Sequence, residues 1–246
     1  MNFQNMKNNL KIVISVGDES GIGPEIILKA LSSDKFPENI DFTLVGSKKN
    51  LQNTFAHLKS LGLKNIANPK NLNIHDLDIS SSDSEPKSGY GNSSFFYLIK
   101  AIEIVKQSPN SALVTGPICK KSWSLAGHHY SGQTEVLAKQ CEVKNVGMLF
   151  TAKSPITGWR FNTILATTHI PLCEVPKKLN MELIHSKLDL LKEFCKTYIK
   201  KPSFKVAGLN PHAGEDGILG SEEKDWLNES LIIWNQKNKD IKLMGP

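Results

Sequence analysis

Two histidines follow short apolar runs that break into turns, and imidazole is a side chain that binds metal ions. His212 follows Val206–Leu209 in the stretch GLNPHAGED, and His169 follows the β-branched run Thr163–Thr168. Such runs predict buried strands, and open α/β sheets bind ligands beyond the carboxyl ends of their strands. Because neutral imidazole is a common ligand of zinc and similar divalent cations, we expect the two rings to share one metal ion. In the alternative interpretation, each imidazole only hydrogen-bonds its own turn.

A glycine-containing loop near the amino terminus is a second candidate binding element. The stretch GDESGIGPE begins at Gly17, directly after the apolar run Lys11–Val16, and its Pro24 and Glu25 suit the first turn of a helix. Backbone N–H groups at a helix start can hold an anion. The spacing G-x-x-x-G-x-G is not the dinucleotide-binding fingerprint, and no P-loop lysine follows. The alternative is a strand-to-helix turn that requires a positive φ angle.

A third polar stretch, GQTE, lies in the middle of the chain. It comprises Gly132, Gln133, Thr134 and Glu135, and it precedes a short helix expected over 136–141. Polar side chains at such a helix start can reach an anion that the helix amides hold. Lys120 comes shortly after a predicted strand, although a lysine in such a place is more often only solvated.

The elements around these stretches alternate between strand and helix. That order predicts an α/β fold with a mainly parallel sheet and flanking helices. A polar segment rich in serine, 76–88, predicts a surface loop. We expect parallel strands at 11–16, 41–45 and 111–114, an antiparallel pair at 146–151 and 161–167, and helices from residue 24 and at 51–61, 91–107, 181–199 and 222–234.

Composition narrows the classes of protein. A chain of 246 residues with 39% hydrophobic and 22% charged residues is typical of a globular protein with one large or two small domains. The net charge is +6, but Arg160 is the only arginine and the lysines are scattered, which indicates a solvated surface rather than a nucleic-acid interface. The four cysteines show no C-x-x-C pair, so we interpret them as reduced thiols.

The chain shows no sequence feature of a membrane protein. No apolar run approaches the ~20 residues that span a bilayer, and the amino terminus MNFQNMKNN lacks the apolar core of a signal peptide. We therefore expect a cytoplasmic protein without a membrane partner.

Five stretches together resemble one family of enzymes. They are GDESGIGPEI, LVTGPICK, SGQTEVLA, ATTHIPL and AGLNPHAGEDGILGSEE, and their order and spacing resemble those of the 4-hydroxythreonine-4-phosphate dehydrogenases of pyridoxal phosphate biosynthesis. The resemblance implies oxidation of a phosphorylated hydroxyamino acid by NAD or NADP, followed by loss of carbon dioxide. It also implies a two-subdomain fold like that of isocitrate and isopropylmalate dehydrogenases, and a homodimer with its active sites at the interface.

The same resemblance suggests roles for individual residues. His169 and His212 match two of the three histidines with which the family binds a divalent metal such as zinc, magnesium or cobalt. Thr134 matches a substrate-binding threonine, whereas Gln133 stands where the family has a substrate-binding histidine. Glutamine donates hydrogen bonds but carries no positive charge, so we expect substrate affinity to depend less on pH. Lys120 matches a frequent lysine that transfers a proton or orients the substrate.

The predicted organisation has three parts. Residues 1–115 form the first part of an α/β subdomain, 116–164 a second subdomain with dimer-forming and substrate-binding elements, and 165–246 the remainder of the α/β region. Members of the family continue past Pro246, and the third metal-binding histidine is expected in that part. Two imidazoles alone would need water or another side chain to complete a metal's shell.

Three further interpretations stay open at this point. One is a related dehydrogenase that acts on another phosphorylated four-carbon hydroxy acid, and one is a truncated, non-catalytic remnant that only binds ligand or a partner. The last is a metal-dependent hydrolase with Glu215 or Asp216 as its base, although no H-E-x-x-H motif supports it.

Overall fold

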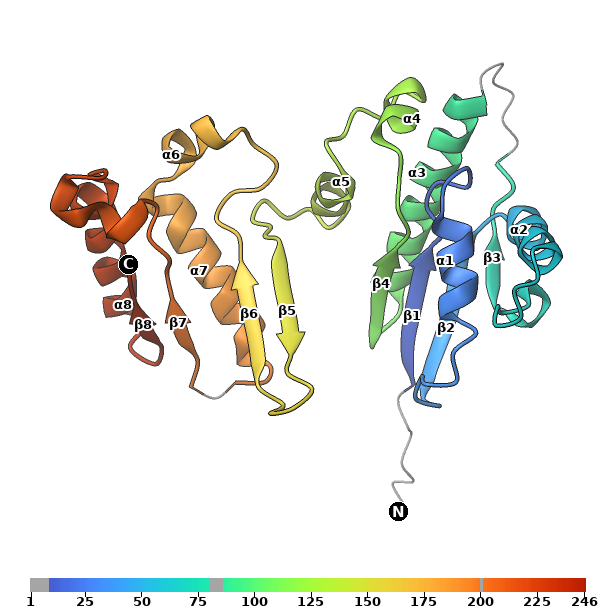
Figure 1. Cartoon of the computed structure of the whole chain (residues 1–246), viewed down its shortest axis with the longest axis horizontal. Coiled ribbons are helices and arrows are strands. Elements are labelled where there is room, and N and C mark those ends of the chain that lie inside the picture. The colour runs from blue at the N-terminus through green and yellow to red at the C-terminus, as the bar shows by residue number, and fades with distance from the viewer. Residues whose placement is uncertain (1–8, 80–85, 200) are drawn as a thin grey trace, which may run out of the picture. The chain divides into compact units, whose positions relative to one another are not determined.

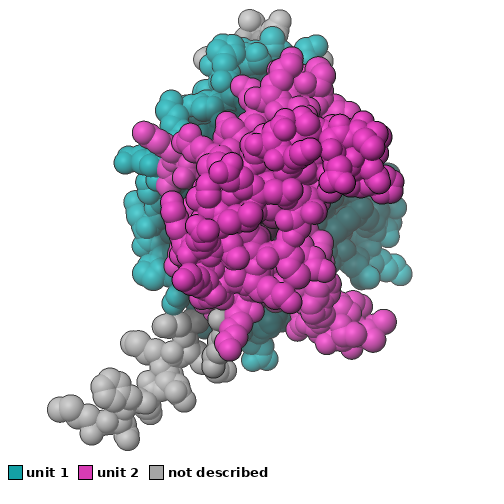
Figure 2. Space-filling view, turned by 90° about the vertical axis from the view of Figure 1, so that its left-hand side faces the viewer, with its two compact units in different colours: residues 1–142 teal, residues 143–246 magenta. Residues whose placement is uncertain are grey.

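The computed structural model describes residues 9–79, 86–199 and 201–246 (Figure 1). The chain divides into two compact units between Glu142 and Val143, coloured teal and magenta in Figure 2. Within the described ranges, no helix is both long enough and apolar enough to cross a membrane.

Unit 1 is built on a parallel sheet with the strand order β3-β2-β1-β4. β2 and β3 lie on one side of β1, and β4 lies on the other side. The direction in which strands are added therefore reverses between β1 and β4, which in α/β sheets is the place where ligands bind. The strands are β1 (Leu10–Ser15), β2 (Ile40–Gly46), β3 (Ile74–Asp76) and β4 (Ser111–Thr115).

The helices of unit 1 begin where the sequence provides start signals. Pro24 lies in the first turn of α1, and the Ser47 side chain caps α2 by accepting a hydrogen bond from the Asn50 N–H. Buried side chains of β1, β2, α1, α2 and α3 make one hydrophobic core, and Trp123 and Val136 join α4 and α5 to α3 in another. The helices are α1 (Gly23–Ala30), α2 (Lys48–Ser60), η1 (Pro69–Asn71), α3 (Pro86–Gln107), α4 (Lys120–Leu125) and α5 (Gln133–Gln140).

Unit 2 contains an antiparallel hairpin and a short parallel strand pair with helices around them. β5 pairs with β6, and β7 pairs with β8 over only three residues each. The arrows of β6 and β7 point the same way in Figure 1. The elements are β5 (Leu149–Lys153), β6 (Arg160–Ile164), η2 (Leu172–Glu174), α6 (Val175–Lys178), α7 (Met181–Lys196), β7 (Ser203–Lys205), η3 (Pro211–Gly217), the π-helical turn η4 (Glu223–Leu227), α8 (Asn228–Lys237) and β8 (Lys242–Met244).

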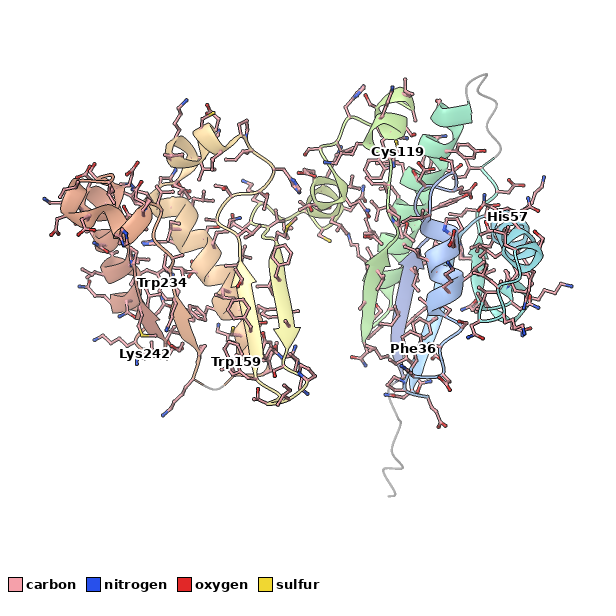
Figure 3. The ribbon with its side chains drawn as sticks, in the orientation of Figure 1. Phe36, His57, Cys119, Trp159, Trp234 and Lys242 are labelled. Atoms are coloured by element: carbon pink, nitrogen blue, oxygen red, sulfur yellow. The ribbon has the colours of Figure 1, made fainter. Side chains whose placement is uncertain are left out.

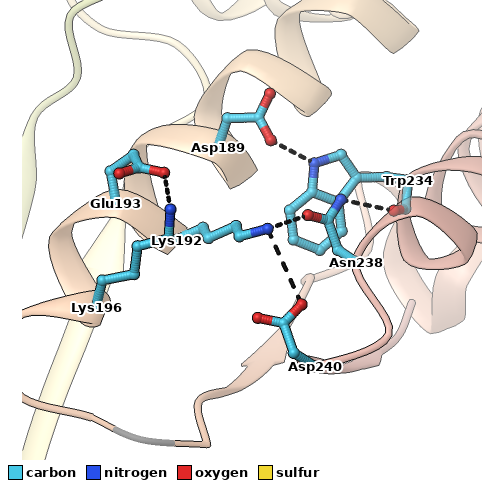
Figure 4. Close-up of polar contacts among 7 residues, drawn as sticks. All are labelled: Asp189, Lys192, Glu193, Lys196, Trp234, Asn238 and Asp240. Carbon is cyan, nitrogen blue, oxygen red and sulfur yellow. Dashed lines mark hydrogen bonds and ion pairs between the residues drawn. The ribbon is translucent and has the colours of Figure 1, made fainter.

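A polar network beside the hydrophobic core joins α7 to α8 (Figure 4). The Trp234 indole N–H donates to Asp189 Oδ1 at 2.8 Å, and the Lys192 ammonium group donates to Asn238 Oδ1. Asn238 Nδ2 in turn donates to the Trp234 carbonyl at 2.8 Å. Because Trp234 and Asn238 are buried, these bonds satisfy polar groups that would otherwise destabilise the core. The network fixes the position of α8 relative to α7.

The structure confirms the α/β class with a parallel sheet and flanking helices. It corrects the predicted surface loop 76–88, because β3 ends at Asp76 and α3 already begins at Pro86; residues 80–85 of that prediction lie outside the described residues. The compact units divide elsewhere than the subdomain boundaries predicted at 115 and 164. Residues 116–142 belong to unit 1, since α4 and α5 pack on α3.

Candidate functional site

The loops that follow β1 and β4 pack backbone against backbone at the reversal point of the sheet in unit 1. The Asp18 N–H donates to the Pro117 carbonyl at 2.9 Å, and the Gly116 N–H donates to the Ser15 carbonyl at 2.7 Å. A Cβ atom on Gly17 would lie 2.3 Å from the Pro117 oxygen, and φ of Gly17 is +80°. The structure therefore supports the interpretation of Gly17 as a turn residue that needs a positive φ.

Gln133 and Thr134 lie in the first turn of α5, whereas the sequence placed them just before the helix. Gln133 is half-buried, and its Nε2 donates to the Gly116 carbonyl at 3.1 Å, so that it ties α5 to the loop after β4. An amide NH₂ group has two hydrogens, and this bond leaves one of them for a ligand. Thr134 is exposed.

Lys120 lies beside the same helix start. A Cβ atom built on Gly132, the residue before α5, would lie 3.9 Å from Lys120 Nζ and 3.6 Å from Glu135 Oε2. The structure thus brings Lys120, Gln133 and Thr134 to one end of α5. Together they offer a cation, an amide and a hydroxyl group to an anionic or polar ligand.

The sequence reasoning missed a hydrogen-bonded pair in unit 1, of which Tyr97 is buried and Glu19 is half-buried. The hydroxyl group of Tyr97, a residue that is 1% exposed, donates to Glu19 Oε1. Burial raises the pKa of Glu19, and Asp78 and Asp18 add to this, while the Tyr97 and Ser47 hydrogen bonds oppose it. Burial and the adjacent Glu19 raise the pKa of Tyr97 as well. Tyr97 lies on the buried side of α3, so the helical spacing of that segment was the signal that could have located it.

In unit 2, the strands end earlier than the sequence predicted, so neither histidine directly follows a strand. β6 ends at Ile164 and β7 ends at Lys205. The last ladder-like bonds are Leu165 N–H to the Met148 carbonyl and Val206 N–H to the Met244 carbonyl, beyond which no partner strand continues. The predicted strand 163–168 is therefore wrong in its bounds, and the predicted strand 206–209 is wrong, since the strand there ends at Lys205. His169 and His212 instead lie in exposed loops.

Both histidines have left-handed backbone conformations. φ is +55° at His169 and +52° at His212, and no other of the seven histidines, all of which lie in described ranges, has a positive φ. For a non-glycine residue this conformation costs roughly 1–2 kcal/mol. Such strain is concentrated at functional sites, where the surrounding structure maintains it.

The two imidazoles also lack hydrogen-bond partners among the described residues. Of the other five histidines, three have ring partners: His128 Nε2 lies 3.0 Å from Asn92 Oδ1, His185 Nε2 lies 2.8 Å from the Ser230 carbonyl, and His129 Nδ1 lies 3.5 Å from Ser124 Oγ. The rings of His57 and His75 have none within the described ranges. Within the described ranges, neither His169 nor His212 hydrogen-bonds its own turn through its ring. Both rings are therefore free to bind a ligand.

His212 begins an unusual turn. Every residue from His212 to Asp216 has a positive φ, between +46° and +84°, and only Gly214 among them is a glycine. The backbone therefore makes one left-handed helical turn, which we call the left-handed turn. L-amino acids disfavour this conformation, so the turn needs support from residues outside it.

A buried carboxylate lies beneath the left-handed turn. Glu223 is 2% exposed, and it accepts hydrogen bonds from Asn210 N–H at 2.7 Å and from Asn210 Nδ2 at 2.8 Å. Glu222 Oε2 also accepts from Asn210 Nδ2, at 2.7 Å. Burial disfavours the charged form of Glu223, but the N–H donors of Asn210 outweigh it and lower its pKa. Sequence reasoning assigned Glu223 only to a helix.

The donors for a divalent cation are incomplete within the described residues. Two exposed imidazoles suit zinc or cobalt in chemical type. However, no group of three or more His, Cys, Asp or Glu side chains that could hold a metal ion occurs in the part of the chain that the structure describes. A cation on these two rings would need water, substrate or another side chain to complete its shell, and the shared metal site stays a prediction.

Comparisons with known proteins agree on one family. A family model described as pyridoxal phosphate biosynthetic protein PdxA matches residues 38–246. The 4-hydroxythreonine-4-phosphate dehydrogenase of Synechococcus sp. (strain RCC307) is 42% identical over 238 residues, which cover 96% of this chain and 72% of that protein. Its counterpart from Synechocystis sp. (strain ATCC 27184 / PCC 6803 / Kazusa) is also 42% identical, over 96% and 70% of the two chains. The crystal structure of the Klebsiella pneumoniae enzyme superposes with a TM-score of 0.76 at 25% identity, covering 99% of this chain and 75% of that one.

Proposed function

Because this chain belongs to the family of the pyridoxal phosphate biosynthetic protein PdxA, we propose that it is a dehydrogenase for 4-phosphooxy-L-threonine in pyridoxine 5'-phosphate biosynthesis. Removal of the hydride and the hydroxyl proton from the secondary alcohol leaves a β-keto acid, which loses carbon dioxide and takes up a proton on carbon to give 3-amino-2-oxopropyl phosphate. NAD or NADP would accept the hydride. The proposal places the enzyme in the cytoplasm, with a small phosphorylated substrate and no nucleic acid.

The observation that carries the proposal is the backbone of the two histidines. His169 and His212 both have a strained left-handed conformation and an exposed ring without a described partner. That arrangement suits rings reserved for a ligand. When bound, a divalent cation such as zinc, magnesium or cobalt would stabilise negative charge on the substrate oxygen as a Lewis acid. His169 and His212 would hold it without neutralising its charge.

The start of α5 supports a second contact with the substrate. Gln133 and Thr134 offer hydrogen-bond donors to the phosphate or carboxylate group, and Lys120 adds a positive charge beside them. In this proposal Lys120 orients the substrate or transfers a proton at Nζ. Since Gln133 is neutral, its contact with the substrate does not change with pH.

An apolar surface on the β5–β6 hairpin supports a homodimer. We define the hairpin patch as Phe150, Ile156, Trp159 and Phe161; Ile156 is 92% exposed and Trp159, labelled in Figure 3, is 65% exposed. Phe150 pairs with Thr163 and Phe161 with Ala152, so both rings lie on one face of the hairpin. Exposed apolar patches of this kind mark association surfaces. A molar mass of two chains in light scattering, reduced to one chain by Trp159→Ser, would support this assembly.

The function is tested by NADH formation with 4-phosphooxy-L-threonine, with zinc, cobalt or magnesium added in turn. We expect turnover that His169→Ala and His212→Ala each abolish, while His57→Ala, a histidine of unit 1 with an ordinary backbone, leaves it unchanged. Turnover only with another phosphorylated four-carbon hydroxy acid would reassign the substrate. A folded protein that shows no turnover and binds no metal would instead be a remnant that only binds a ligand or a partner.

A further inference from the structure

We propose that Glu223 is a positioning residue, whose buried carboxylate holds the left-handed turn so that the His212 ring is presented to its ligand. The inference rests on the proposed role of His212 as a ligand-binding residue. Nothing in the motifs distinguishes Glu223 from its neighbour Glu222, so the assignment comes from the contacts alone.

The first argument is that Glu223 binds the residue before the turn and lies close to the middle of the turn. Its two carboxylate oxygens bind the backbone N–H and the side-chain amide of Asn210, which precedes the turn. On the other side, a Cβ atom on Gly214, in the middle of the turn, would lie 3.2 Å from Glu223 Oε2. The carbonyl of Asn210 accepts the Ala213 N–H at 3.1 Å, which carries the anchoring one step further into the turn.

The second argument is that no hydrogen bond from a described residue fixes the His212 ring. The ring has no hydrogen-bond partner among the described residues, so the backbone of the turn sets where the ring lies. Four of the five residues of the turn are not glycine, and they adopt positive φ only if outside contacts hold them there. From outside, the Leu219 N–H donates to the Gly214 carbonyl at 3.0 Å and the Ile218 N–H to the Glu215 carbonyl at 3.1 Å. Among the described residues, the buried side chain that anchors the start of the turn, through Asn210, is Glu223.

The third argument is that Glu223 is itself held by the core of unit 2. It opens the π-helical turn η4, whose last residue, Leu227, is buried against Leu231 and Trp234. Single π-helical turns occur frequently at functional sites. The carboxylate therefore connects the rigid packing of α7 and α8 to a loop that has little core of its own.

The decisive experiment observes the His212 ring directly, without metal. Carbon-13 labelling of histidine Cε1 in the full chain gives a separate NMR signal for each ring, assigned by single substitutions. In Glu223→Gln we expect the His212 signal to shift or split and amide exchange in 208–217 to accelerate at least about tenfold. The signals of His57 and His75 should not change.

Two further variants separate positioning from general stability. Asp189→Asn takes the charge from the acceptor of the Trp234 indole in the same unit and so weakens that bond. It should destabilise the core while the His212 signal stays in place. Asn210→Ala keeps the Glu223 carboxylate but removes the side-chain bonds to it. It should change the His212 signal in the way expected for Glu223→Gln, and it tests the proposal even if Glu223→Gln does not fold. An unchanged His212 signal in a folded Glu223→Gln or Asn210→Ala protein would overturn the proposal.

Cobalt alone provides the second readout, by calorimetric titration of the whole chain. We expect Glu223→Gln to weaken binding about tenfold or more, as for other groups that orient a metal ligand, and Asp189→Asn to leave the affinity unchanged. If the wild-type chain binds no cobalt, the metal assignment of His212 fails, whereas the NMR experiment still decides what Glu223 does. Equal losses of affinity in Glu223→Gln and Asp189→Asn would overturn the positioning role.

Discussion

Each unit has a carboxylate beside its loops that is at least half-buried, Glu19 in unit 1 and Glu223 in unit 2, and the two carboxylates have opposite pKa shifts. In unit 1 the pKa of Glu19 is raised, chiefly by burial. In unit 2 the pKa of Glu223 is lowered, although burial acts on it in the raising direction too. Burial alone therefore does not decide the sign of the shift.

The difference lies in the groups that face each carboxylate. Glu19 receives the Tyr97 hydroxyl and a Ser47 backbone N–H, but Asp78 and Asp18 are near enough to repel its charge. Glu223 receives the backbone and side-chain N–H groups of Asn210 at short distances. Hydrogen bonds to the charged form favour that form. The comparison indicates that the surroundings of Glu223 favour its charged form, which suits a structural anchor, whereas those of Glu19 disfavour the charged form.

Replacing the anchor should have the largest effect. In Glu223→Leu both donors of Asn210 lose a buried acceptor, and we expect unit 2 to lose roughly 2–4 kcal/mol of stability. Hydrogen exchange of the Leu231 amide should report this loss, while the Val13 amide in unit 1 should not.

Glu222→Leu is the matched control, since it removes only one bond to Asn210, at a half-buried position. We expect less than half of the loss. A Glu222→Leu effect as large as that of Glu223→Leu would contradict the special role of the buried carboxylate.

The acid side of the stability profile should separate the two carboxylates next. Because the pKa of Glu223 is lowered, its carboxylate stabilises the folded state at pH values above the ordinary pKa of this group, 4.5. This contribution is lost as the pH falls through the lowered pKa. Melting temperatures recorded between pH 3 and 7 should therefore fall less steeply with acid in Glu223→Gln than in wild type. Parallel profiles for the two proteins would show that Glu223 does not contribute to acid unfolding.

Glu19 should behave in the opposite sense, with a smaller effect. Because its pKa is raised, its charged form is disfavoured in the folded state, and stability decreases as the pH rises from about 4.5 through the raised pKa. Glu19→Gln keeps an acceptor for Tyr97 without the charge, so it should raise the melting temperature at pH 7 and leave it unchanged at pH 4. The exposed Glu25, changed to Gln, is the control, and a similar gain there would point to net charge instead.

The two units also differ in how much of them could be predicted. In unit 1, apolar runs that end in glycine, such as Lys11–Val16, give clear strands, and β1 and β2 each lie between two neighbours in a parallel sheet. In unit 2, β7 and β8 pair over three residues only, and the run 206–209 continues as irregular backbone. Apolar composition indicated a strand there, but strand length depends on a partner that composition does not reveal.

The candidate site was predictable in its residue types and not in its geometry. His169 and His212 stand out from the motifs, yet of the left-handed turn only Gly214 signals a positive φ. The anchor Glu223 reads as an ordinary acidic residue at a helix start, because its burial depends on the packing of Leu227 and Leu231. Long-range contacts of this kind have no local sequence pattern.

The smallest expected effect concerns the start of α5, where unit 1 offers a neutral contact in place of a titrating one. Gln133→His would introduce a ring with an ordinary pKa near 6.5, so the KM for the phosphorylated substrate should fall a few-fold at pH 5.5 relative to pH 8. The wild-type KM should change over the same range only through the second ionisation of the substrate phosphate. Gln133→Asn, which is also neutral at residue 133, should show the same change and serves as the control. Because Gln133 is bound to the Gly116 carbonyl, Gln133→Asn should also show whether that bond holds α5 in place. Equal pH profiles for Gln133→His and wild type would place residue 133 away from the charged part of the substrate.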